Sequence, residues 1–322
     1  MRIQTTQSRL LMNAGGNVGK AVVVLMGIQL FSFACTRLAA QEYRMRQIEP
    51  FAPPAAETNI VQVPGPVEVG EAGETEDLGP QIVLRRRKQP LFSLSSDTEV
   101  LYSSNVALSP HHPVSDELLF QTLGVSFTPP VLQQFSPALY VRQQFVCYST
   151  QSALDFDTQT AGLSFATPVM DWFNLYGDFS ASRAYSEGND GEFYREFDAE
   201  LGLWRSTPLT RNASLYYGYQ EDWLPSSPSD LAEWDNAIYA GLNVRLIGPL
   251  SAQYLTRVRL REYFQSSRTD LDYLLSAALN CTFNRYVMVR AYATYAYNNS
   301  NQPEFRYSVD NLGAALDLSI RF

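Results

Sequence analysis

The chain has two histidines, His111 and His112, which stand next to each other between Pro110 and Pro113. A hydrolase that uses histidine needs it to be oriented by a partner and to lie close to a nucleophile. No serine or aspartate stands at such a motif spacing from this pair, so we expect no enzyme and no cofactor. Paired histidines could also bind a metal, but a solvated loop is the simpler interpretation, and we predict no metal site.

The charged residues that could act on a solute recur at every second position. Arg257, Arg259 and Arg261 alternate with apolar residues, and Arg245 and Arg290 occur in segments of the same pattern. A second group is acidic and consists of Asp178, Glu196, Asp198 and Glu200. Side chains at every second position of a β-strand share one face. Each group should therefore line one surface.

Segments of alternating apolar and polar residues would position these groups. Twelve of them follow Leu91, and each is long enough for a tilted strand to cross a bilayer. They centre on Thr98 to Val106, Glu117 to Phe127, Ala138 to Tyr148, Phe156 to Ala166, Trp172 to Arg183, Tyr194 to Trp204, Asn212 to Asp222, Asn236 to Ile247, Ser251 to Tyr263, Leu271 to Phe283, Tyr286 to Tyr297 and Tyr307 to Phe322. Lipid-facing strands must close on themselves, because an open edge leaves backbone groups unsatisfied. We predict an all-β fold, a closed antiparallel transmembrane β-barrel of about twelve strands over residues 91–322.

The last segment fixes which face meets lipid. Its apolar residues at every second position are Leu312, Ala314, Leu316, Leu318, Ile320 and Phe322. With the same parity, Arg257, Arg259 and Arg261 point inward. A shift by one residue would place these arginines in hydrocarbon at about 2–4 kcal/mol each, so the pattern determines the register.

The inward charges have two interpretations. Arginines on one arc and carboxylates on another would create a transverse field across a water-filled lumen, which filters solutes. Alternatively, the charged side chains pair and fill a narrow barrel, as Asp272 would do with Arg261. Twelve strands fall between the filled barrels of eight and the open channels of sixteen. This size is compatible with a conduit for small solutes and not with a large pore, and it leaves both interpretations open.

The connections between segments alternate in character. Polar connections such as Ser186 to Gly191 and Asn298 to Glu304 alternate with tight ones such as Ile247 to Leu250 and Asn284-Arg285. Short periplasmic turns and longer outer loops are typical of outer-membrane barrels, so we expect both barrel termini on the periplasmic side. The segment from Pro129 to Pro137 is a long exception.

The first 40 residues are typical of a cleaved signal peptide. Arg2, Arg9 and Lys20 precede or flank the apolar stretch from Ala21 to Cys35, which is short for a transmembrane helix. We predict cleavage after Ala40, with acylation at Cys35 as the alternative.

Residues 41–90 contain seven prolines and an acidic run, with no sustained periodicity. They predict a disordered, Pro/Glu-rich periplasmic linker.

Charge and cysteine content narrow the partners. The formal net charge is −9, and an acidic chain is unsuited to nucleic acid. Cys147 and Cys281 fall on the lipid-facing set, where cysteine serves as a small apolar residue. A disulfide between them stays open as an alternative.

The two ends of the alternating region resemble a known family. Thr98 to Val106, followed by Leu118 to Phe127, looks like the first hairpin of bacterial outer-membrane β-barrel porins. Asn311 to Phe322 resembles the C-terminal assembly signal of that class. The resemblance implies that Leu318, Ile320 and Phe322 are recognised by the barrel-assembly machinery, with Phe322 as the terminal residue of the signal.

These expectations combine into a hypothesis about function. The protein would lie in the outer membrane of a Gram-negative-type cell envelope and act as a porin-like passive channel for small polar or anionic solutes. Its partners would be outer-membrane lipid, the assembly machinery and those solutes. The alternative is a non-conducting structural or interaction barrel, linked through residues 41–90 to envelope or exopolysaccharide-export assembly.

Overall fold

The computed structural model describes residues 68–69, 84–85, 91–129, 135–169, 172–186 and 191–322. The predicted signal peptide and the predicted acylation site at Cys35 lie outside these residues. So does most of the predicted linker, apart from β1 (Glu68–Val69) and β2 (Leu84–Arg85), which pair antiparallel. In the described part of the chain, no helix is long and apolar enough to cross a membrane.

The described residues from Leu91 onward form twelve long strands, which confirms the predicted number. Their bounds are β3 (Phe92–Ser103), β4 (Asp116–Phe127), β5 (Ser136–Tyr148), β6 (Phe156–Val169), β7 (Phe173–Ser186), β8 (Glu192–Pro208), β9 (Ala213–Leu224), β11 (Glu233–Arg245), β12 (Leu250–Tyr263), β13 (Thr269–Thr282), β14 (Val287–Ser300) and β15 (Tyr307–Arg321). The short strand β10 (Ser226–Ser227) pairs with β8. Three single 3₁₀ turns lie in connections at Ser152–Leu154, Ser229–Leu231 and Pro303–Phe305.

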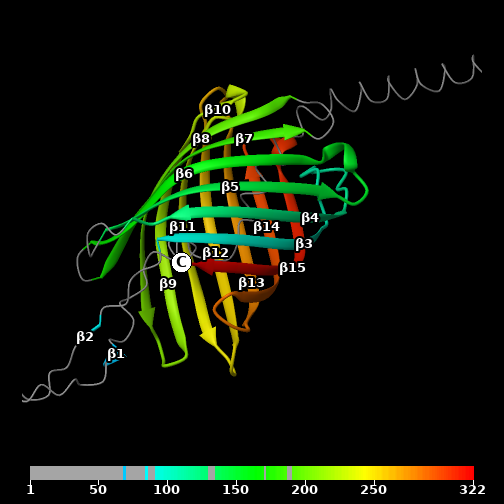
Figure 1. Cartoon of the computed structure of the whole chain (residues 1–322). Helices are drawn as coiled ribbons and strands as arrows, with labels where there is room; N and C mark the ends of the chain where they lie inside the picture. Colours follow the sequence, from blue (N-terminus) through cyan, green and yellow to red (C-terminus); the bar gives the residue numbers. More distant parts are fainter. Residues whose placement is uncertain (1–67, 70–83, 86–90, 130–134, 170–171, 187–190) are drawn as a thin grey trace, which may run out of the picture. The chain divides into compact units, whose positions relative to one another are not determined.

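Each long strand pairs antiparallel with its neighbours in sequence, and the first pairs with the last. Ser93 of β3 lies opposite Arg321 of β15, and the backbone N–H groups of Leu91 and Phe92 both donate to the carbonyl of Phe322 at 3.0 Å. Figure 1 shows β3 in cyan beside β15 in red. The sheet therefore closes into the predicted barrel, and both barrel termini lie at one end.

Burial alternates along the strands with the predicted parity. In β15, Leu312, Leu316 and Ile320 are exposed on the outer surface, whereas Asn311 and Ala315 are buried. In β12, Arg259 and Arg261 are buried while Leu260 between them is exposed. Along these two stretches the apolar residues face outward and the charged residues face inward, as the sequence predicts.

The first strand is shifted from its predicted position. The segment expected to extend to Val106 ends as a strand at Ser103, and β3 begins earlier, at Phe92. Val106 lies in the following connection, where its N–H donates to the carbonyl of Val114 at 2.7 Å. The polar residues at the start of β3 are part of the sheet because β4 and β15 pair with their backbone on the two sides.

The connections at the two ends of the barrel differ. Four-residue turns at 209–212, 246–249 and 283–286 lie at the end with the termini, whereas most connections at the other end are longer. The long connection at Pro129 to Pro137 still joins an antiparallel hairpin, because β4 and β5 pair directly. We call these ends the termini end and the loop end.

Tyrosines on the inner wall lie across glycines of the neighbouring strand. The pairs, each directly opposite in the ladder, are Tyr140 with Gly162, Tyr176 with Gly202, Tyr216 with Gly241, Tyr239 with Gly218 and Tyr292 with Gly313. A Cβ atom added at Gly313 would come within 2.4 Å of the Tyr292 ring. Only glycine allows the ring to lie this close to the wall. We call these the tyrosine–glycine pairs.

Candidate pore lining

Asp235 of β11 lies at the centre of the main charge cluster on the inner wall. Its Oδ2 atom accepts hydrogen bonds from Arg259 Nη1 and from Arg261 Nε, both at 3.1 Å. Arg261 Nη1 also lies 2.6 Å from Asp272 Oδ2 on β13. These side chains are almost fully buried. The predicted pairing of Arg261 with Asp272 is confirmed, and it extends to Asp235, which the sequence analysis did not single out.

Arg290 forms a second cluster where the barrel closes. Its Nη2 atom lies 3.4 Å from Asp317 on β15 and 3.9 Å from Asp97 on β3. Two residues further along β14, the Tyr292 hydroxyl donates a hydrogen bond to Glu99 of β3. Since Arg290 and Tyr292 belong to β14, both side chains cross β15 to reach the first strand.

The other two arginines of the predicted set are more accessible. Arg245 is exposed at the last position of β11, at the termini end. Its backbone N–H donates to the backbone carbonyl of Asn212 at 2.7 Å. Arg257 faces inward near the middle of β12 and is half-buried. The five arginines therefore divide by burial: Arg259, Arg261 and Arg290 are buried against carboxylates, and Arg245 and Arg257 present more surface.

The four predicted carboxylates face inward on β7 and β8. Tyr140 donates to Asp178 at 2.6 Å, and Tyr194 donates to Glu196. Asp178 lies directly opposite Glu200, and Glu200 lies opposite Asp222 of β9. Ser180 is the neighbour of Asp198. A row of carboxylates thus crosses three adjacent strands and continues to Asp235 of β11.

The two predicted charge groups are separated by one strand, as the sequence suggested: β9 lies between the carboxylates of β7 and β8 and the first arginine strand, β11. Further inward carboxylates lie among the arginines or between the two groups: Asp97, Glu99, Asp222, Asp235 and Asp270. The parity rule that placed the arginines inward would have found each of them.

The rejected catalytic and metal interpretations concern His111 and His112. Both are exposed in the connection between β3 and β4. Within the described residues, no group of three or more histidine, cysteine, aspartate or glutamate side chains is arranged to hold a metal ion. Cys147 and Cys281 lie on β5 and β13, which are not neighbouring strands.

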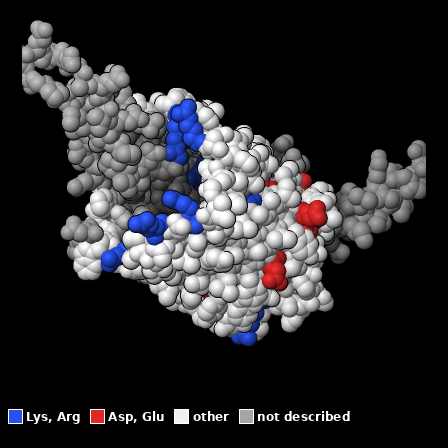
Figure 2. All heavy atoms as spheres, turned by 90° about the horizontal axis from the view of Figure 1, so that it is seen from below, with Lys and Arg blue, Asp and Glu red and all other residues white. Residues whose placement is uncertain are grey.

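Figure 2 shows one face of the molecule with a hollow. Arginine side chains gather at the edge of this hollow, and the Asp and Glu side chains visible on this face lie away from it.

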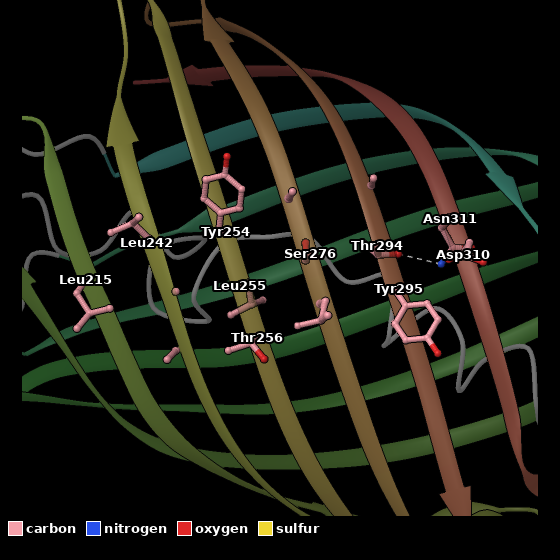
Figure 3. Close-up of a pocket in the computed structure, with 15 residues that line it drawn as sticks. Leu215, Leu242, Tyr254, Leu255, Thr256, Ser276, Thr294, Tyr295, Asp310 and Asn311 are labelled. Carbon is pink, nitrogen blue, oxygen red and sulfur yellow. Dashed lines mark hydrogen bonds between the residues drawn. The ribbon is translucent and has the colours of Figure 1, made fainter.

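A separate recess of about 680 Å³ lies on the outward surface of β9 to β15. Figure 3 shows Leu242 and Tyr254 among the residues that line the recess. Asn311 and Thr294 also border it, and the Asn311 amide donates a hydrogen bond to the Thr294 hydroxyl at 3.0 Å. Ala240, Ala277 and Ala293 also line the recess. Its apolar lining suits hydrocarbon and not a polar solute, so the recess is no part of the pore lining.

The C-terminal residues of the predicted assembly signal also close the sheet. The Phe322 N–H donates to the Phe92 carbonyl at 3.0 Å, and the two rings stack with centroids 6.0 Å apart. Leu318 and Ile320 are exposed on the outer face of β15.

No protein-family model matches the chain, and no curated protein matches it. Several solved structures match the chain in fold. An outer membrane channel from Pseudomonas putida F1 aligns with a TM-score of 0.52 at 8% identity, over 73% of this chain and 97% of that chain. The translocator domain of the autotransporter NalP from Neisseria meningitidis gives 0.45 at 15% identity, over 73% and 90%. The KdgM porin gives 0.40 at 9%, over 69% and 97%. The first likeness supports the barrel fold alone, and the other two are too distant to carry an argument.

Proposed function

We propose that this barrel lies in the outer membrane of a Gram-negative-type cell envelope and acts as a porin-like passive channel for small polar or anionic solutes. The observation that carries the proposal is the closed barrel whose outer face is apolar and whose inner face carries arginines and carboxylates. A charged inner wall lowers the cost of moving a polar solute past hydrocarbon. The termini end, with its short turns, faces the periplasm, and the longer connections face outward.

The arginines have different roles in this proposal. Arg259, Arg261 and Arg290 hold carboxylates in place, so they shape the wall. Arg245 and Arg257 present more surface to a passing solute. They attract its anionic groups, while Asp178, Glu196, Asp198 and Glu200 repel them from the other arc. Selectivity follows from this transverse field.

Planar bilayers that contain the purified protein test the proposal. We expect small discrete conductances, and the ion preference should shift toward cations when Arg257 is replaced by serine. Leu260→Ser is the control because Leu260 faces outward on the same strand. Silence at every voltage, with a folded barrel in the membrane, would contradict a channel and favour a non-conducting interaction barrel.

A further inference from the structure

Uncharged polar side chains cross the lipid-facing surface of β3 to β6. They are Ser96, Thr98, Gln121, Gln143 and Gln159, and each has the outward parity of its strand. The ladder places Thr98 opposite Gln121, and Gln143 opposite Gln159. Ser96 lies opposite Leu123, which in turn lies opposite Gln143. We call these five residues the amide band.

Four of the five residues of the amide band lie near the middle of their strands, and Gln159 is the fourth residue of β6 (Phe156–Val169), directly opposite Gln143. Ser96 and Thr98 are central in β3 (Phe92–Ser103), as is Gln121 in β4 (Asp116–Phe127). Strand ends meet the headgroup region, whereas strand centres meet the hydrocarbon. A glutamine at mid-strand on this face is therefore in contact with acyl chains unless something covers it.

The hydrogen-bonding capacity of the band is only partly used within the barrel. Thr98 Oγ1 donates to Gln121 Oε1 at 2.6 Å, and Gln121 Nε2 donates to Ser96 at 3.0 Å. In the described part of the chain, no hydrogen bond joins the side-chain amides of Gln143 and Gln159 to another group. Hydrocarbon offers no donor or acceptor, so an amide exposed to it is disfavoured.

The strand centres of the opposite wall are more apolar. The outward positions there include Leu275, Ala277, Ala293 and Leu312, with the hydroxyl of Thr256 as an exception. The outward polar residues Asn236 and Asp310 lie nearer the starts of β11 and β15. The amide band also borders a recess of about 400 Å³ lined by Leu94, Leu123, Val141 and Gln143, among others. One side of the barrel is thus suited to lipid, and the other carries polar groups beside a concave surface.

We propose that the amide band is the contact surface for a second copy of this chain. The inference rests on the proposed membrane location. A primary amide carries both donors and an acceptor, so Gln143 and Gln159 can bond to the same residues of an identical barrel. A twofold axis needs such a self-complementary patch. Lipid tails cannot supply these bonds, and the band carries no charge that calls for a charged partner.

Cysteine cross-linking in liposomes that contain the full chain tests the interface. In a background with all three native cysteines replaced by serine, Gln143→Cys should form at least ten times more covalent dimer on oxidation than Ala277→Cys on the opposite wall. The ratio of protein to lipid is kept low, so that random collisions contribute little. Equal dimer yields at the two positions, or none at either, would overturn the proposal.

A second measurement covers the case in which cysteine disturbs the site. Light scattering of the detergent-solubilised protein should give a dimer for the wild type and a monomer for the double variant Gln143→Leu and Gln159→Leu, with Thr256→Val as the control that stays dimeric. A wild-type monomer would count against the interface.

Conductance and the heat-dependent gel mobility of a folded barrel are recorded on the same samples. Channels without dimers would contradict only the interface, whereas dimers without channels would contradict only the proposed transport.

Discussion

At the scale of single residues, the inner wall depends on carboxylates that serve more than one partner. Asp235 accepts from two arginines of β12, and Asp272 approaches one of them from β13. An arginine pair on one strand would repel itself without these carboxylates. Residues first expected to act on solutes thus also hold neighbouring strands together.

Replacing Asp235 by asparagine should destabilise the barrel by about 3 kcal/mol, because two buried arginines lose a shared negative partner. Denaturant titration in lipid vesicles, read by gel mobility, measures the change. Glu262→Gln is the control, since Glu262 is exposed at the loop end of β12, and its effect should stay within about 0.5 kcal/mol. Equal stability of the two variants would show that the cluster contributes nothing.

Replacing Gly313 by valine should cost about 2 kcal/mol, because the new side chain occupies the position of the Tyr292 ring. The ring would move into the lumen and its bond to Glu99 would break. Ala314→Val, at the exposed position next in sequence, should leave the denaturation midpoint nearly unchanged. The idea fails if Gly313→Val is as stable as the wild type.

At the scale of the strands, alternation predicted most of the structure. It predicted the number of strands, the inward arginines and the outward face of β15. The two faces could be assigned because a one-residue shift would place charge in hydrocarbon. It misplaced β3, whose first half contains three serines and an aspartate and resembles a turn locally. That stretch is a strand because it pairs with β4 on one side and with β15, more than 200 residues away, on the other. Local sequence does not encode these partners.

The candidate pore lining was less predictable than the fold. Parity places a side chain inward, but it does not tell which inward side chains meet. The contact of Arg290 with Asp97 requires both the register of β14 with β15 and the closure of β15 on β3. The tyrosine–glycine pairs likewise depend on cross-strand register.

Two adjacent positions of β7 test the parity directly. Phe179 is exposed at mid-strand, and Ser180 faces inward opposite Asp198. Phe179→Arg should destabilise the barrel in lipid by about 2–4 kcal/mol, whereas Ser180→Arg should be tolerated because it gains a carboxylate neighbour. The same vesicle titration compares both variants with the wild type. The reverse order of stability would mean that the faces are assigned the wrong way round.

At the scale of the whole molecule, closure brings the first and last strands together at several levels. Backbone bonds join Leu91 and Phe92 to Phe322, the Phe92 and Phe322 rings stack, and Tyr292 reaches Glu99 across β15. A barrel can form these contacts only after its last residues are available. The C-terminal residues therefore have a structural role beside the proposed assembly signal.

Phe322→Ala separates these two roles. If the assembly machinery reads this residue, the amount of folded barrel in the outer membrane of cells should fall at least fivefold, while spontaneous refolding into detergent micelles falls much less. Gel mobility of the heated and unheated protein measures both. Leu312→Ala, an outward residue far from the end of β15, should change neither. A parallel loss in cells and in micelles would indicate a purely structural role.

The tyrosine–glycine pairs also have a geometric consequence for the barrel interior. A ring that lies over a glycine of the neighbouring strand stays against the wall, whereas any larger residue at that position would push the ring toward the barrel axis. The five glycines therefore keep five tyrosine rings against the wall. A single methyl group gained at one of them would narrow the interior at that point, with no change in the number of strands.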